Sequence, residues 1–180
     1  MNKSYLWLLQ LTNFILYMSL QIAILENLLP VYTPSCFVYV GFFLFLPWKR
    51  TNLLLQLLLS FFVGLIVDAL YNSLGVHTFA AVLLIYLRNF LLHILPPYAA
   101  NDSEYATRPT LSNMGFRKFF VYVFFILFMY HTTVLCLNVR SMMLLFTAIP
   151  QLTFSIILSC FLIFFFQVLL LITASNTYIK

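Results

Sequence analysis

Long apolar runs separated by short polar stretches fill this chain. Six such segments can be distinguished: Tyr5–Leu25, Pro34–Pro47, Leu53–Tyr71, Thr78–Leu95, Phe119–Asn138 and Leu144–Ile172. A helix that crosses a bilayer needs about 20 predominantly apolar residues, with roughly 17 as the lower limit. All segments except the second reach that length. The pattern therefore predicts an all-α integral membrane protein built as a bundle of about six transmembrane helices.

The second segment, Pro34–Pro47, is shorter than this limit. It either enters the membrane and returns, or crosses where the bilayer is thinned. Basic residues help to decide, because short cytoplasmic loops carry an excess of Lys and Arg. If all six segments cross and both termini are cytoplasmic, Arg140 is the one basic residue on the outer side of the membrane. If the second does not cross, Lys3 joins it there, so the charges favour six spans.

The composition agrees with a membrane protein. Hydrophobic residues make up 64% of the chain and charged residues 7%, whereas a soluble domain carries about 25% charge. We therefore expect a single integral membrane domain over residues 1–180, without an appended soluble domain. The net charge of +5 comes from basic residues scattered at helix ends. That distribution is typical of topology signals, so the bilayer is an expected partner and nucleic acid is not.

No catalytic or metal-binding pattern is present. The three histidines lack the spacing of metal ligands, and no nucleophile elbow or phosphate-binding loop occurs. His77 and His93 are predicted to lie near the two membrane surfaces, and His131 to hydrogen bond between helices. We predict no enzymatic activity, no cofactor and no metal. The cysteines form no close pair and are expected to be small buried hydrophobic residues: Cys36, Cys136 and Cys160.

Two charged residues, Asp68 and Arg88, lie inside apolar segments. At a rise of about 1.5 Å per residue, Asp68 falls in the outer part of the membrane and Arg88 about one and a half turns deeper. A charge at that depth is costly unless it is paired, hydrated or extended to a surface. One arrangement is an Asp68–Arg88 pair. In the other, Arg88 extends inward with Asn89 beside it, while Asp68 reaches the outer headgroups.

The stretch GLIVDALYNSLGVH, residues Gly64–His77, predicts a tight helical hairpin. Gly64 lies one turn before Asp68 on the same helix face and lets a neighbouring helix approach closely. Asn72 and Gly75 supply the backbone angles that reverse the chain within a few residues. The motif thus combines close packing, a polar anchor and a forced turn.

This stretch, extended to GLIVDALYNSLGVHTFAAVLLIYLRNFLL, resembles the signature region of the rod shape-determining protein MreD family. That family carries a Gly-Leu-x-x-Asp helix end, a short turn with Gly and a following helix with small residues. The matching positions are Gly64, Leu65, Asp68, Gly75, Ala80 and Ala81. The flanking VYVGFFLFLPWKRTNLLL and MGFRKFFVY also fit, and the similarity is strongest over Tyr39–Leu95. The family's small or proline residue near Leu74 is lacking here.

The resemblance implies a six-helix fold similar to the substrate-binding subunits of vitamin transporters, in the bacterial cytoplasmic (inner) membrane. It implies a non-enzymatic scaffold of the cell-elongation complex, together with MreB, RodA and the elongation transpeptidase. There it would help an MreC-like single-span protein to assemble and guide lateral peptidoglycan synthesis, and so cell shape.

Two roles follow for parts of this chain. Asp68 would be a polar anchor that organises the hairpin or accepts a hydrogen bond from the partner. The polar loop Pro96–Lys118 either contacts the inner machinery or is a plain connection. The alternative function is a small-molecule-binding subunit of a transporter, with Asp68 and Arg88 as ligand contacts.

Overall fold

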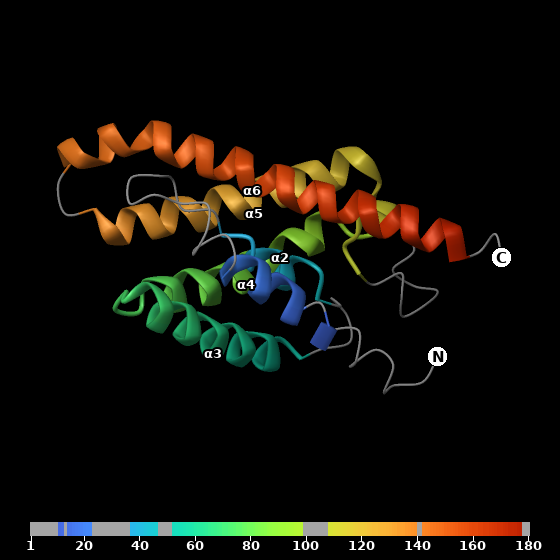
Figure 1. The fold of residues 1–180 in the computed structure, drawn as a ribbon, viewed down its shortest axis with the longest axis horizontal. Helices are drawn as coiled ribbons and strands as arrows, with labels where there is room; N and C mark the ends of the chain where they lie inside the picture. Colours follow the sequence, from blue (N-terminus) through green and yellow to red (C-terminus); the bar gives the residue numbers. More distant parts are fainter. Residues whose placement is uncertain are drawn as a thin grey trace.

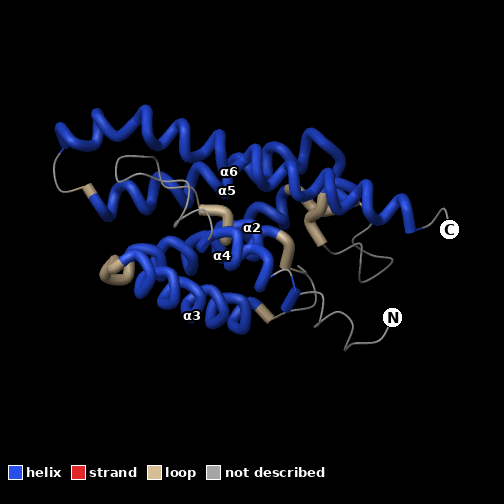
Figure 2. Tube along the Cα trace, viewed as in Figure 1, coloured by secondary structure: helices blue, strands red, loops and turns tan. Residues whose placement is uncertain are grey.

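The computed structural model describes residues 11–12, 14–22, 37–46, 52–98, 108–139 and 142–177, with side chains in the last range described for 148–169. Residues 14–22 are helical. The helices that follow are α2 (Val40–Leu44), α3 (Leu53–Tyr71), α4 (Val76–Ile94), α5 (Leu111–Asn138) and α6 (Met142–Thr177). Within the described ranges no strand occurs (Figure 2).

The long helices form two antiparallel pairs. α3 packs along α4, α5 packs along α6, and α4 joins the pairs by packing against α5. In Figure 1, the short helix α2 and the blue helical stretch near residues 14–22 lie between the two pairs. The middle of the helical bundle is therefore filled by residues 37–46, against which one side of the stretch 14–22 packs.

Among the described residues, four helices are long and apolar enough to cross a membrane: α3, α4, α5 and the part of α6 over Ala148–Leu169. Many large apolar side chains on their outer faces are exposed, as expected for surfaces that lipid covers; Leu54, Phe62 and Ile157 are examples. The chain is thus a helical, multi-pass membrane protein.

The prediction of six spanning helices is wrong for the second segment, and with it the expected six-helix likeness to transporter substrate-binding subunits. Of Pro34–Pro47, the structure describes residues 37–46, and these contain only the 5-residue helix α2. A helix of that size rises about 8 Å, far less than a bilayer. All residues from Phe37 to Leu46 are buried except Phe42, which is half-buried. The predicted first span, Tyr5–Leu25, lies partly outside the described residues.

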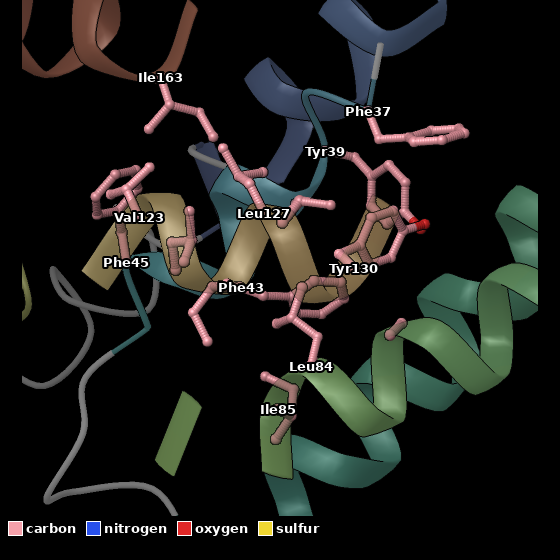
Figure 3. Packing of buried hydrophobic residues seen from close by; sticks show 14 of the residues in the cluster. Phe37, Tyr39, Phe43, Phe45, Leu84, Ile85, Val123, Leu127, Tyr130 and Ile163 are labelled. Carbon is pink, nitrogen blue, oxygen red and sulfur yellow. The ribbon is translucent and has the colours of Figure 1, made fainter. Parts of the chain in front are cut away.

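The second segment is apolar because it is the centre of the core. Figure 3 shows its aromatic side chains lying among residues of α4, α5 and α6. The labelled residues are Phe37, Tyr39, Phe43, Phe45, Leu84, Ile85, Val123, Leu127, Tyr130 and Ile163. Burial inside protein and burial in lipid select the same residue types, so the apolar run alone does not separate them.

The fifth helix begins earlier than predicted, at Leu111 instead of Phe119. The backbone N–H groups of Asn113 and Met114 donate to the Thr110 carbonyl, at 3.1 and 3.0 Å, and start a helical turn. Gly115 then interrupts the helix with φ 70° and ψ 160°. The predicted loop Pro96–Lys118 is therefore partly helical, and its residues 99–107 lie outside the described part.

The cysteine prediction is correct only in part. Cys136 and Cys160 are free thiols. Cys160 is half-buried, but Cys136 is exposed on the outer face of α5 rather than buried in the bundle. Cys36 lies outside the described residues.

Candidate functional site

The carboxylate of Asp68 forms the centre of the α3–α4 hairpin. Its Oδ1 accepts hydrogen bonds from the Ser73 hydroxyl at 2.5 Å and the His77 backbone N–H at 2.9 Å. Its Oδ2 accepts from the backbone N–H and the hydroxyl of Thr78, at 2.9 and 2.5 Å. Only 5% of Asp68 is exposed. All four donors belong to the turn and to the first turn of α4.

Asp68 therefore caps a helix to which it does not belong. The residue at the N-cap of α4 is Gly75, which has no side chain to bind the free backbone N–H groups. A carboxylate at a helix N-terminus satisfies those donors and faces the positive end of the helix dipole. The last turn of α3 supplies this carboxylate, so the two helices are joined at their shared end.

The backbone around Asp68 has the geometry that the hairpin pattern predicts. A Cβ atom on Gly64 would lie 2.5 Å from the Thr78 Cα, so the two helix backbones are in direct contact there. Asn72, with φ 52°, and Gly75, with φ 80°, both adopt left-handed conformations. The backbone N–H of Ser73 closes the turn on the Asp68 carbonyl at 3.0 Å. The contact of this hairpin with a partner protein stays a prediction.

Arg88 does not pair with Asp68, and that prediction is wrong. Arg88 is fully buried, and its Nη1 donates to Gln56 Oε1 at 3.1 Å, while Nη2 donates to the Leu46 carbonyl. Asn89 Nδ2 donates to the same Gln56 oxygen at 3.1 Å, so it does lie beside Arg88 as the second arrangement expected. That arrangement is otherwise wrong as well, because Arg88 stays in the core and Asp68 is buried in the hairpin.

Arg88 holds the buried segment 37–46 in place. The carbonyl groups at the C-terminal end of a helix have no hydrogen-bond partner within the helix, and a cation near them is favourable. Arg88 donates to the Leu46 carbonyl, and the Tyr122 hydroxyl donates to the Leu44 carbonyl at 2.8 Å. The fourth and fifth helices thus provide the donors that allow a short helix to end inside the core.

A second polar cluster was missed in the sequence. His77 Nδ1 and the Tyr130 hydroxyl are 2.8 Å apart, and that hydroxyl is hydrogen bonded to the hydroxyl of Tyr39. Figure 3 shows Tyr39 and Tyr130 side by side in the core. His77, predicted at a membrane surface, is only 3% exposed because the Phe37 ring covers it at a centroid distance of 4.8 Å.

Gln21 extends this cluster toward the N-terminal helix. Its Nε2 donates to the Tyr71 hydroxyl at 2.6 Å, and its Oε1 accepts from the backbone N–H groups of Val38 and Tyr39 at 2.7 and 3.3 Å. A glutamine in an apolar helix indicates a polar contact of this kind. Its backbone partners, Val38 and Tyr39, lie in the segment Pro34–Pro47, which was predicted to span the membrane. The polar cluster therefore forms only because that segment is buried in the core.

The prediction for His131 is confirmed, and the position of His93 near a membrane surface stays a prediction. His131 Nε2 and the Ser159 hydroxyl are 3.2 Å apart and join α5 to α6, as expected for interhelical hydrogen bonding. His93 is exposed in the last turn of α4. Within the described part of the chain, no group of three or more potential metal ligands occurs.

Comparisons with protein-family models, with curated proteins and with solved structures find no match to this chain. The fold and composition define its class, that of helical multi-pass membrane proteins. The particular family is therefore a matter for proposal.

Proposed function

We propose that this chain is a non-enzymatic scaffold of the bacterial cell-elongation complex, of the MreD type. The observation that carries the proposal is that the residues matching the family signature lie together and form one structural unit. Gly64, Asp68 and Gly75 of that signature build one unit, in which a close helix contact, a cap and a turn meet. A signature of this kind is expected where a family depends on one rigid shape.

The distribution of polar groups supports a scaffold. Buried polar side chains from several elements are hydrogen bonded to other parts of the same chain, among them Asp68, Gln21 and His131. The outer faces of the long helices are apolar. In lipid, helices associate through close packing and interhelical polar contacts. Such a bundle would present a firm apolar surface to a single-span partner resembling MreC.

The proposed setting is the inner membrane, with both termini in the cytoplasm. α3 would then run outward and α4 inward, which places the Asn72–Gly75 turn on the outer side. The end near Tyr98 would face the cytoplasm, where MreB acts. RodA and the elongation transpeptidase would be reached through the same complex, whose output is lateral peptidoglycan synthesis.

The alternative, a ligand-binding transporter subunit, gains no support from the geometry. Its two expected ligand contacts were Asp68 and Arg88. The Asp68 carboxylate already accepts four hydrogen bonds, and Arg88 is fully buried.

Depletion of the protein in its own bacterial host, followed by measurement of cell width, tests the proposal. We expect depleted cells to widen and round, and wild-type protein to restore the rod. Asp68→Ala should restore it poorly, and Ser73→Ala should restore it well, because Ser73 supplies only one of the donors to the carboxylate.

Affinity purification in mild detergent with mass spectrometry gives a second, independent measurement. An MreC-like single-span protein should accompany the wild type. Unchanged cell width on depletion, together with recovery of an ATPase module or a small molecule instead of such a partner, would contradict the scaffold function.

A further inference from the structure

A basic corner lies at the end of the bundle where α4 ends and α5 begins. We define it by Tyr98, Gly115, Phe116, Arg117 and Lys118. Tyr98 is 71% and Phe116 67% exposed, Arg117 is exposed and Lys118 is partly exposed. Figure 1 shows the end of α4 in lime and the start of α5 in yellow at this side of the molecule.

Three contacts fix the shape of the basic corner. The Tyr98 backbone N–H donates to the Asn113 carbonyl at 2.9 Å. The Lys118 ammonium lies 3.9 Å from the centroid of the Tyr98 ring, within cation–π distance. Gly115 adopts φ +70°, where an L side chain is strained, and a Cβ there would lie 3.4 Å from the Tyr98 ring. The corner is therefore held in place before any ligand arrives.

A bilayer crossed by the apolar part of α5 would begin beside the two cations that follow the break at Gly115. Arg117 and Lys118 directly precede the apolar part of α5, which starts at the fully buried Phe119. Tyr and Trp are enriched at membrane interfaces, where their amphipathic rings sit at the headgroup level. Tyr98 is suited to that position beside the cations, and the exposed Phe116 adds apolar surface next to it.

No described carboxylate balances these charges. Asp68 is the one acidic residue within the described ranges, and it lies in the hairpin that caps the opposite end of α4. We propose that the basic corner binds the phosphate of an anionic phospholipid in the leaflet at this end of the bundle. Arg117 and Lys118 contact the phosphate, and the exposed rings of Tyr98 and Phe116 lie against the glycerol and upper acyl chain.

The choice of an anionic phospholipid as the ligand follows from the positive charge of the basic corner and from its place next to the apolar part of α5. A basic residue near an anionic membrane surface contributes about 1 kcal/mol, which corresponds to about fivefold in retention for each cation. The cation–π contact restrains Lys118 in a position where it can meet a headgroup. This inference does not depend on the proposed scaffold function.

Native mass spectrometry of the full-length protein, equilibrated with equal amounts of phosphatidylglycerol and phosphatidylcholine, tests it. The wild type should retain phosphatidylglycerol in preference. The variant Arg117→Gln/Lys118→Gln removes both cations and should lower that retention by about 25-fold, about fivefold for each cation. The matched control is Lys49→Gln/Arg50→Gln, an adjacent basic pair that shortly precedes α3 in the sequence and lies outside the described residues. Asp102 and Glu104 stay unchanged in both.

The control should keep wild-type retention. Equal losses in the two double variants would show a diffuse charge effect and would overturn the site, as would an absence of lipid preference in the wild type. Tyr98→Leu keeps the net charge but removes the ring that holds Lys118, and it should also lower retention severalfold. If the double variant fails to fold, wild-type retention by Tyr98→Leu would by itself contradict a preformed corner.

Discussion

Asp68 shows how one side chain can stabilise two helices at once. It lies in the last turn of α3, yet its carboxylate binds backbone N–H groups of His77 and Thr78 in α4. Inside a membrane those N–H groups have no water to bind, and an unsatisfied one is costly. The charge at this depth is therefore tolerated because the hairpin itself supplies its donors.

Asp68→Ala should lower the free energy of unfolding by about 2–4 kcal/mol, since a helix cap and charge-assisted hydrogen bonds are lost together. Ser73→Ala removes one donor to the same carboxylate and should cost about 1 kcal/mol. Reversible unfolding of the full-length protein in mixed micelles measures both. Equal effects would mean that the backbone N–H bonds contribute nothing beyond the hydroxyl.

Gly64→Ala should cost about 1–3 kcal/mol, because the new methyl group meets the backbone of Thr78 and overpacks the helix contact. Gly41→Ala is the matched control. A Cβ at Gly41 would also be crowded, at 2.6 Å, but by a side-chain ring, that of Tyr17, and not by backbone. The same unfolding measurement should give the smaller loss at Gly41, and the reverse order would contradict the direct contact of α3 and α4.

The sequence could predict where Asp68 lies but not what it binds. Residue counting along two helices places Asp68 and Arg88 within reach of each other, and pairing two opposite charges is then the simplest solution. The actual partners of Asp68 are mainly backbone N–H groups and hydroxyls of the turn, and Arg88 binds an amide and a carbonyl. Backbone groups have no signature in a sequence, so this choice of partners could not be predicted.

At the scale of whole elements, α2 is the informative case. The length of the apolar runs predicts α3, α4 and most of α5 and α6 well, because a spanning helix needs a fixed length. The apolar composition of the short run Pro34–Pro47 is equally compatible with burial in lipid and with burial in the protein core. The start of α5 was missed because Ser112 and Asn113 lower the hydropathy without preventing a helical turn.

Tyr122→Phe tests how α2 is held. It removes the donor to the buried Leu44 carbonyl and should cost about 1–3 kcal/mol, the penalty for an unsatisfied buried acceptor. Tyr86→Phe makes the same chemical change at an exposed tyrosine of α4 and should change the free energy of unfolding by less than about 0.5 kcal/mol. Similar values for the two variants would show that the end of α2 does not need Tyr122.

At the scale of the molecule, two antiparallel pairs set which connections share a side of the membrane. The turn after α3 and the end of α5 lie at one end of the bundle, and the end of α4 with the start of α5 lies at the other (Figure 1). The number of spans before α3 does not affect this relation. The part of the topology that rests on α3–α6 is therefore independent of the segments that precede α3.

Single cysteines at Leu74, Asn138 and Tyr98, in a background without the native cysteines, test this arrangement. A membrane-impermeant maleimide added to intact cells should label the first two positions, which the proposed orientation places outside. Tyr98→Cys should react only after permeabilisation. Labelling of Leu74→Cys and Asn138→Cys from opposite sides would contradict the antiparallel order of α4 and α5.

The cap that Asp68 provides has a consequence for the synthesis and membrane insertion of the protein. When α3 leaves the ribosome, the donors at His77 and Thr78 have not yet been synthesised or have not yet turned back, so the carboxylate has no partner in lipid. Held alone in the bilayer, α3 would bear an unmatched charge. The insertion machinery would thus be expected to retain α3 until α4 emerges and to release both into the membrane as one unit.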